Sequence, residues 1–141
     1  MTRALGLDLG DRRIGVALSD SAGALALPYE VVERSGDRGR DHGRIAELVD
    51  ETAAGVVVVG LPLSLDGSRG PAALAVEAEA AQLESRLGVP LVLWDERLST
   101  VEAAKRLAAA GLSAKKRRRT IDQVAATVIL QAWLDATRPR P

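Results

Sequence analysis

The sequence contains no cysteine and one histidine, His42. Disulfide bonds and thiolate metal sites are therefore excluded, and a histidine-based zinc site is disfavoured. Aromatic residues are also scarce, since the chain has only Tyr29, Trp94 and Trp133. Modules that bind nucleic acid by stacking bases on aromatic side chains fit this composition poorly.

Signal peptides and membrane-length apolar runs are also missing from the sequence, so we expect a cytoplasmic protein without membrane contact. A length of 141 residues suits one domain with a single core. We therefore interpret residues 1–141 as a single domain with a short flexible tail at 137–141. Nineteen basic and nineteen acidic residues cancel, so the global charge does not indicate a polyanionic partner.

The segment 4–10 organises the chain, because large and small residues alternate strictly along it. Leu5, Leu7 and Leu9 fall on one side of a predicted strand, and this side must face a core. The opposite side carries Asp8 between glycines. A carboxylate in mid-strand is disfavoured, and glycine there often marks the close approach of a ligand or another backbone. Asp8 is thus either a partnered acid at a crowded strand crossing or a functional acid.

A second strand with the same alternation follows a turn-like segment at 10–13, which predicts a β-hairpin. Its large residues are Ile14, Val16 and Leu18, and its small residues are Gly15, Ala17 and Ser19. The small face would lie beside Asp8. Such a face admits either a closely packed helix or an approaching phosphate chain, and the pattern alone does not choose.

The elements that follow the hairpin begin with a third strand at 24–32. Pro28 within it predicts an edge strand or a bulge, because proline cannot donate a ladder hydrogen bond. We expect a Gly- and Arg-rich mobile loop at 34–44. A short amphipathic helix is predicted from Ile45 to about residue 54.

The second half of the chain alternates strands and helices, which predicts parallel strands with right-handed crossovers. The β-branched run at 56–59 is typical of a strand covered on both faces. A helix over 71–88 and a strand over 91–94 follow. Capping boxes predict two more helices, at 99–111 and from residue 120 to about 136. The layout is a mixed α/β sandwich.

Three carboxylates from separate elements are the candidate catalytic residues: Asp8, Glu96 and Asp122. Glu96 lies just past the C-terminal end of a buried parallel strand, where ligands bind in open α/β sheets. Asp122 shares a helical stripe with apolar residues, so its carboxylate should face the body of the protein. Taken alone, Glu96 reads as a polar residue that leaves a strand, and Asp122 reads as a partner of the helix dipole.

If these three acids converge, their chemistry favours a metal site. Carboxylates without histidine or cysteine fit oxygen-preferring Mg²⁺ or Mn²⁺. Two such ions can activate a water and stabilise the leaving oxygen of a phosphodiester. The sequence therefore predicts that Asp8, Glu96 and Asp122 are both the metal ligands and the catalytic residues.

Cationic residues near these acids are predicted to hold the flanking phosphates of a nucleic acid. They are Arg12, Arg13, Arg97, Lys115, Lys116, Arg117, Arg118 and Arg119. The last five form an unbroken run that we predict to be a loop. A basic run is more often a solvated loop than a binding site, but its position ahead of Asp122 makes the two readings equally plausible.

Four motifs stand in order along residues 4–131. They are Gly6-Leu7-Asp8-Leu9-Gly10 with Arg13-Ile14-Gly15-Val16-Ala17, Val59-Gly60-Leu61-Pro62 with Asp66-Gly67-Ser68, Asp95-Glu96-Arg97-Leu98-Ser99-Thr100, and Ile121-Asp122-Gln123-Val124-Ala125-Ala126 with Ile129-Leu130-Gln131. Together they resemble the YqgF family, whose members are described as candidate pre-16S ribosomal RNA nucleases or RuvX-type Holliday-junction resolvase homologues. The family pattern often has Thr-Lys where this chain has Asp11-Arg12.

The resemblance implies a ribonuclease H-like fold, which is a mixed five-stranded sheet with helices on both faces. It places Asp8, Glu96 and Asp122 at the acidic positions of the family. It implies an endonuclease that trims the 5′ end of pre-16S ribosomal RNA in ribosome biogenesis, with pre-ribosomal particles as partners. Branched DNA is the other substrate that the resemblance suggests.

Two alternatives from other classes stay open at this point. One is a non-catalytic RNA-binding factor that acts in ribosome assembly. The other is an ATP-binding protein, because the Asp-Leu-Gly hairpin also resembles the phosphate loop of actin-like sugar kinases and heat-shock ATPases. Those proteins need two lobes and a far longer chain, which argues against this second alternative. The sequence does not decide the oligomeric state or the cleavage specificity.

Overall fold

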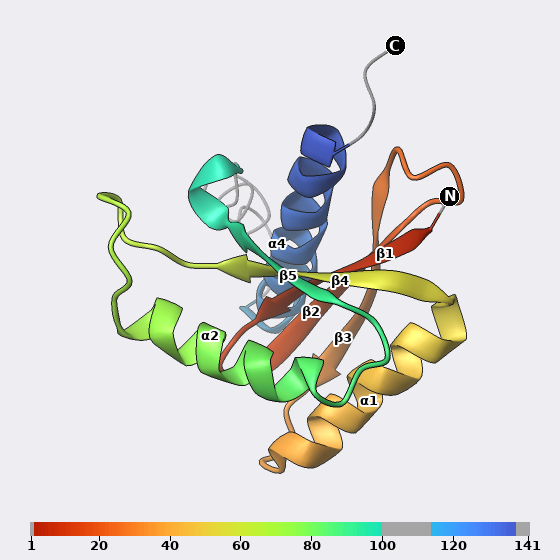
Figure 1. Cartoon of the computed structure of the whole chain (residues 1–141). Coiled ribbons are helices and arrows are strands. Elements are labelled where there is room, and N and C mark those ends of the chain that lie inside the picture. Colours follow the sequence, from red (N-terminus) through yellow and green to blue (C-terminus); the bar gives the residue numbers. More distant parts are fainter. Residues whose placement is uncertain (1, 100–113, 138–141) are drawn as a thin grey trace.

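Figure 1 shows the computed structural model, which describes residues 2–99 and 114–137, with the backbone alone for 114–120. The elements in chain order are β1 (Arg3–Leu9), β2 (Arg13–Ser19), β3 (Ala26–Glu33), α1 (Arg38–Thr52), β4 (Ala54–Leu61), α2 (Pro71–Glu84), β5 (Leu91–Asp95), the 3₁₀ helix η1 (Glu96–Leu98) and α4 (Ala114–Thr137). Among the described helices, none is both long and apolar enough to cross a membrane.

The five strands form one mixed sheet in the order β3-β2-β1-β4-β5. β1, β2 and β3 pair antiparallel, whereas β4 and β5 run parallel to β1. The predicted mixed five-stranded sheet is therefore confirmed. β3 is an edge strand, and its register with β2 shifts between Val16 and Ala17, next to Pro28. This is where a residue without a backbone N–H was expected to disturb the ladder.

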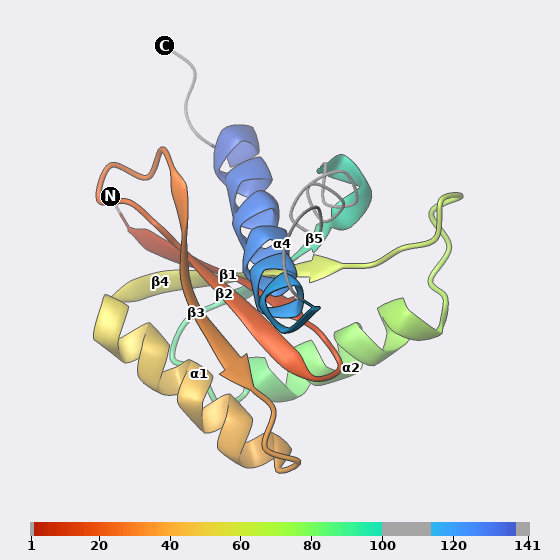
Figure 2. The ribbon, with the colours of Figure 1, turned by 180° about the vertical axis from the view of Figure 1, so that it is seen from behind.

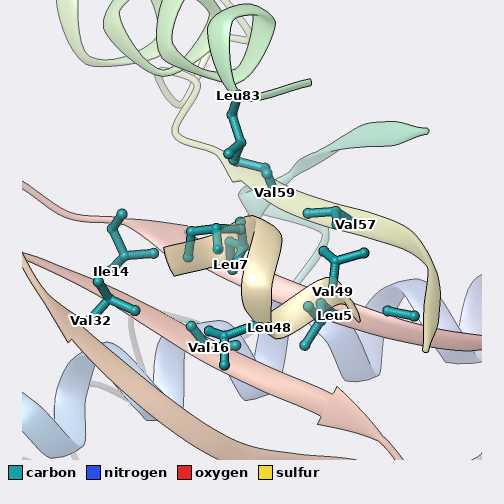
Figure 3. Packing of buried hydrophobic residues seen from close by; sticks show 12 residues of the cluster. Leu5, Leu7, Ile14, Val16, Val32, Leu48, Val49, Val57, Val59 and Leu83 are labelled. Carbon is teal, nitrogen blue, oxygen red and sulfur yellow. The ribbon is translucent and has the colours of Figure 1, made fainter. Parts of the chain in front are cut away.

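Helices cover both faces of the sheet, with α1 and α2 along one face and α4 across the other (Figure 2). Figure 3 shows the core under α1 and α2, which contains Leu5 and Leu7 of β1, Leu48 of α1 and Leu83 of α2. These four side chains are fully buried. The prediction that the leucine side of β1 faces a core is confirmed.

The face of small residues lies against α4. Ala125 and Ala126 of α4 are fully buried against Ala4 and Ala17 of the sheet. A Cβ atom on Gly6 would stand 2.7 Å from the Cβ of Leu130, so any side chain at this position would push the helix away. Of the two readings of the small face, the closely packed helix is therefore the one that the structure shows over most of its length.

Two predicted helix boundaries, the start of α1 and the end of α2, are wrong. The segment 34–44 is not a continuous loop, because α1 begins at Arg38 and not at Ile45. Asp37 caps the helix by accepting a hydrogen bond from the backbone N–H of Arg40 at 3.1 Å. Asp at an N-cap supplies a partner for one of the otherwise unpaired N–H groups of the first turn. α2 begins at Pro71 as predicted but ends at Glu84, before Gly88.

The basic run is also helical, which corrects the prediction of a loop at 115–119. α4 begins at Ala114, so Thr120 lies inside the helix and does not cap it. Lysine and arginine are good helix formers, and nothing in the run stops a helix. The predicted helix at 99–111 lies almost wholly outside the described residues, which end at Ser99 on that side, and so does most of the tail at 137–141.

Candidate functional site

Asp8 stands near the C-terminal end of β1, between two glycines of the neighbouring strands. It pairs with Gly15 of β2. On the other side, the parallel register that sets Leu7 opposite Val59 brings Asp8 next to Gly60 of β4. The half-buried side chain of Asp8 points to the same face as Gly6, which is the face of α4. No side chain from these two neighbouring positions crowds it.

Asp122 lies directly above Gly15. A Cβ atom on Gly15 would collide with the backbone carbonyl of Asp122, so this glycine lets α4 touch the sheet. The carboxylate Oδ1 of Asp122 stands 3.7 Å from the position that a Cβ on Gly10 would take. The same stripe of α4 carries Ala125 and Ile129, both fully buried, so the predicted inward face of Asp122 is confirmed.

The helix-dipole reading of Asp122 is excluded by its place in α4. The helix begins at Ala114, eight residues before Asp122. The attraction of a helix N-terminus for a carboxylate falls off within the first turn. Asp122 therefore sits where the packing of α4 on the sheet puts it, and not where a helix end favours it.

Glu96 reaches the same region from the other side of Asp8. It is the first residue of η1, directly after β5. Its half-buried side chain folds back over Gly60, so that Oε1 lies 2.7 Å and Cγ 3.1 Å from the position of a Cβ on Gly60. The side chain of Ile129 from α4 lies against the same glycine. Glu96 thus occupies the space that the missing side chain leaves.

The three acids therefore surround the end of β1 on one face of the sheet. Gly15, Asp8 and Gly60 stand side by side on three adjacent strands, which are spaced about 4.8 Å apart. Asp122 lies over the first and Glu96 over the last. Within the described residues, however, no three His, Cys, Asp or Glu side chains form a group already arranged to hold a metal ion. The acids gather at one end of the sheet without forming a closed cage.

The donor chemistry of this set fits a hard divalent cation. Asp8, Glu96 and Asp122 offer carboxylate oxygens, the ligands that Mg²⁺ and Mn²⁺ prefer. Mg²⁺ usually keeps several waters and takes only one or two protein carboxylates. An open arrangement of acids at a strand end is thus compatible with such an ion.

The cationic residues predicted to bind phosphates differ in their surroundings. Arg12 is exposed at the tip of the β1–β2 turn. Arg13 pairs with Glu33 of β3, with Nε 3.1 Å from Oε2. The backbone of 115–119 forms the helical turns that precede Asp122, and the side chains of Lys115, Lys116, Arg117, Arg118 and Arg119 lie outside the described part of the structure. Their contact with phosphates stays a prediction.

Arg97 is held by groups of the protein itself. Its Nη2 lies 2.7 Å from Oδ2 of Asp95, and its Nε donates to the same carboxylate. Its Nη1 donates to the carbonyl of Leu65 at 3.3 Å, in the loop between β4 and α2. The hydrogen bonds between the two side chains raise the pKa of Arg97 and lower that of Asp95. Arg97 thus ties the β4–α2 loop to Asp95, the residue that precedes Glu96.

A buried ion pair on the opposite face escaped the sequence reasoning. Arg34 donates two hydrogen bonds to Glu79 of α2, at 2.8 and 2.9 Å, and Nε2 of His42 lies 2.8 Å from the same carboxylate. Glu79 is 4% exposed. A signal was present, because Glu79 falls on the apolar stripe of its helix between Val76 and Leu83.

Comparison with known proteins gives a consistent result over nearly the whole chain. Residues 2–136 match the family described as "RuvX: Holliday junction resolvase". A Geobacillus kaustophilus protein called "Putative pre-16S rRNA nuclease" is 47% identical over 138 residues, covering 96% of this chain and 99% of its own. A Myxococcus xanthus protein of the same name is 49% identical over 137 residues, covering 97% of this chain and 90% of its own.

Solved structures give the fold. RuvC of Thermus thermophilus in complex with a Holliday junction substrate aligns with a TM-score of 0.61 at 18% identity, covering 100% of this chain and 99% of the other. Another structure of Thermus thermophilus RuvC aligns with a TM-score of 0.53 at 21% identity, over 96% and 95% of the two chains. These likenesses confirm the ribonuclease H-like fold that the sequence motifs predicted.

Proposed function

The chain belongs to the RuvX family, and on that basis we propose that it is a metal-dependent endonuclease that hydrolyses phosphodiester bonds in nucleic acid. The observation that supports this proposal is the placement of Glu96 and Asp122 over the two glycines that flank Asp8. Three acids from β1, η1 and α4 are brought to one end of the sheet by this packing. Such a group is what cleavage of a phosphodiester with divalent ions requires.

Asp8, Glu96 and Asp122 would hold Mg²⁺ or Mn²⁺. The ions, when bound, supply an activated water and charge stabilisation for the leaving oxygen. The chain itself supplies the positions of the acids, because the backbone of β1 fixes Asp8 and the packing of α4 on Gly15 fixes Asp122. Fixed acids need little reorganisation when the substrate arrives, which is the main source of catalysis in such sites.

The basic residues support a nucleic acid substrate. The helical turns of 115–119 directly precede Asp122 in α4, and Arg12 is exposed at the turn next to Asp8. Cations at these two places would bind phosphates that flank the scissile bond. In this proposal the five consecutive cations of α4 bind the substrate and are not only a solvated part of the helix.

The substrate we propose is the 5′ end of pre-16S ribosomal RNA, because the relatives at 47% and 49% identity carry that name. A Holliday junction or another branched DNA is the second candidate, favoured by the description of the matching family. A non-catalytic RNA-binding role is the outcome that remains if neither is cut.

The test is cleavage by the purified chain of two labelled substrates, a pre-16S RNA fragment with its 5′ leader and a four-way DNA junction. We expect cleavage with Mg²⁺ or Mn²⁺, none with EDTA, and loss of at least 100-fold in D8N and D122N, since two-metal cleavage needs these ligands. D135N is the matched control, because Asp135 is exposed on the same helix. Binding without cleavage by the wild type would favour the assembly-factor role.

A further inference from the structure

Arg34 joins the β1–β2 turn from the face of the sheet opposite the acids. Its Nε donates to the carbonyl oxygen of Gly10 at 2.7 Å. Its backbone N–H donates to the carbonyl of Arg12 at 2.9 Å. Gly10 in turn donates its N–H to the carbonyl of Asp8 at 3.0 Å. The side chain and the backbone of Arg34 thus bind Gly10 and Arg12, on the two sides of the turn that follows the candidate catalytic Asp8.

The guanidinium of Arg34 is itself fixed. Both of its terminal nitrogens donate to the carboxylate of Glu79, and Nε2 of His42 lies 2.8 Å from the same carboxylate. The side chains of Arg34, Glu79 and His42 are 16%, 6% and 3% exposed. Bidentate pairs of this kind restrict orientation as well as distance. The nitrogen that reaches Gly10 is therefore held in one place by two helices, α1 and α2.

Stability alone does not explain this arrangement. Compared with apolar side chains of similar volume, a buried ion pair contributes little net stability, because the cost of removing both charges from water offsets their attraction. A cavity of about 490 Å³ borders the network and is lined by Gly10, Arg34 and Glu79, together with Leu9 and Pro62. The turn has open space on this face, so it depends on Arg34 for its support there.

We propose that Arg34 is a positioning residue for the nuclease site, which fixes Gly10 and thereby the distance between Asp8 and Asp122. This inference rests on the proposed function. Gly10 connects the two acids. Its backbone N–H donates a hydrogen bond to the backbone carbonyl of Asp8, and a Cβ on Gly10 would lie 3.7 Å from Oδ1 of Asp122 on the other face. A displacement of 1 Å at a catalytic group can cost about 100-fold in rate, so a loosened turn would lower kcat while leaving substrate binding largely intact.

The test compares R34M with R44M. Arg44 is a matched control, because it also makes a bidentate pair, with Glu30 at 2.9 and 3.0 Å, and its other hydrogen bonds run to Glu47 and Glu51 on α1. In R34M we expect amide hydrogen exchange in the segment 8–13 to be at least 10-fold faster and kcat at least 10-fold lower, with KM changed less than twofold. In R44M we expect neither change.

A folded R34M with unchanged exchange at 8–13, or with faster exchange but unchanged kcat, would overturn the proposal. Equal losses in R34M and R44M would also overturn it, because they would show a general effect of removing an ion pair. If R34M does not fold, R34K replaces it. Lysine keeps the charge opposite Glu79 but lacks the planar fork that serves Glu79 and Gly10 together, so intermediate changes in exchange and kcat are expected, and wild-type values of both would contradict the inference.

The exchange measurement needs no substrate, which separates this inference from the proposed function. If the wild type cuts no nucleic acid, the proposed function fails. The role of Arg34 at the turn is then decided by exchange alone: faster exchange in R34M supports it, and unchanged exchange rejects it.

Discussion

The carboxylate of Glu96 lies against the backbone of Gly60, with Oε1 2.7 Å from the position that a Cβ there would take. The side chain of Ile129 approaches the same point from α4. Glu96 of η1 and Ile129 of α4 therefore both pack on Gly60 of β4. Because Gly60 has no side chain, Glu96 at the end of β5 can lie over the strand next to Asp8.

The substitution G60A is expected to displace Glu96 and to abolish most of the activity. Overpacking at a fully enclosed position costs about 1–3 kcal/mol, and Glu96 can relieve part of it by rotating away from the site. The loss of rate should therefore exceed what the loss of folded protein explains. Measurements of kcat and of urea unfolding on the same preparation would show this.

The control for G60A is G88A, because no atom lies within 4 Å of the position of a Cβ on Gly88. Its activity should match that of the wild type. A G60A protein that is folded and fully active would show that Glu96 need not occupy the space over Gly60 for the reaction.

The substitution G15A is expected to act on stability as well as on rate. A Cβ on Gly15 would collide with the backbone carbonyl of Asp122, and a helix backbone moves less easily than a side-chain end. We expect a loss of about 2–3 kcal/mol in the free energy of unfolding, measured by urea denaturation. G43A in α1 is the control, since its Cβ would meet only the end of the Arg86 side chain, at 3.3 Å, and alanine should stabilise the helix by about 0.5–1 kcal/mol. A G15A protein as stable as the wild type would show that α4 can shift without cost.

Replacing the five cations at 115–119 with glutamine tests their contact with phosphates. Glutamine keeps the helix propensity of the run, so the backbone of α4 should persist. Each lost phosphate contact flattens the slope of log affinity against log salt by about 0.7–0.9. We expect a flattening by several such steps, measured by binding titrations of RNA between low and physiological salt. An unchanged slope would mean that these residues serve only as a solvated part of the helix.

The parts of the site that the sequence predicted are those that follow from a local period. The alternation along 4–10 showed which side of β1 faces the core, and the helical stripe from Asp122 to Ile129 showed which way the acid points. Both patterns need only neighbouring residues. The position of Glu96 over Gly60, on the strand next to Asp8, could not be read from a period, because it depends on the order of β4 and β5 in the sheet.

The wrong prediction for 115–119 and the unpredicted ion pair have different causes. The charge of the basic run predicts a loop, but Lys and Arg also favour helices, and α4 continues through the run. The pair of Arg34 and Glu79 joins residues 45 positions apart across two elements. No local pattern specifies such a partner. Only the acid on the apolar stripe of α2 indicated that a buried cation had to exist somewhere.

Glu79 makes the stability of the protein depend on acid pH in a defined window. Burial raises the pKa of this carboxyl group, but the hydrogen bonds from Arg34 and His42 and the charge of Arg38 outweigh burial and lower it to about 2, from an ordinary value of 4.5. A group whose pKa is lower in the folded state stabilises the fold above its unfolded pKa and loses this contribution as the pH falls through the folded pKa. The loss should therefore fall between about pH 4.5 and pH 2.

The variant E79Q tests this dependence. The wild type should lose on the order of 3 kcal/mol from Glu79 across that window, whereas E79Q starts less stable at pH 7 and should show a flatter decline between pH 4.5 and pH 2. E47Q is the control, because Glu47 is 66% exposed and pairs with Arg44 on the surface, so its curve should follow the wild type. Urea unfolding at a series of pH values gives the three curves. Parallel curves for the wild type and E79Q would mean that Glu79 titrates in the folded protein as it does in the unfolded chain, and that Arg34 is not held by a charged partner.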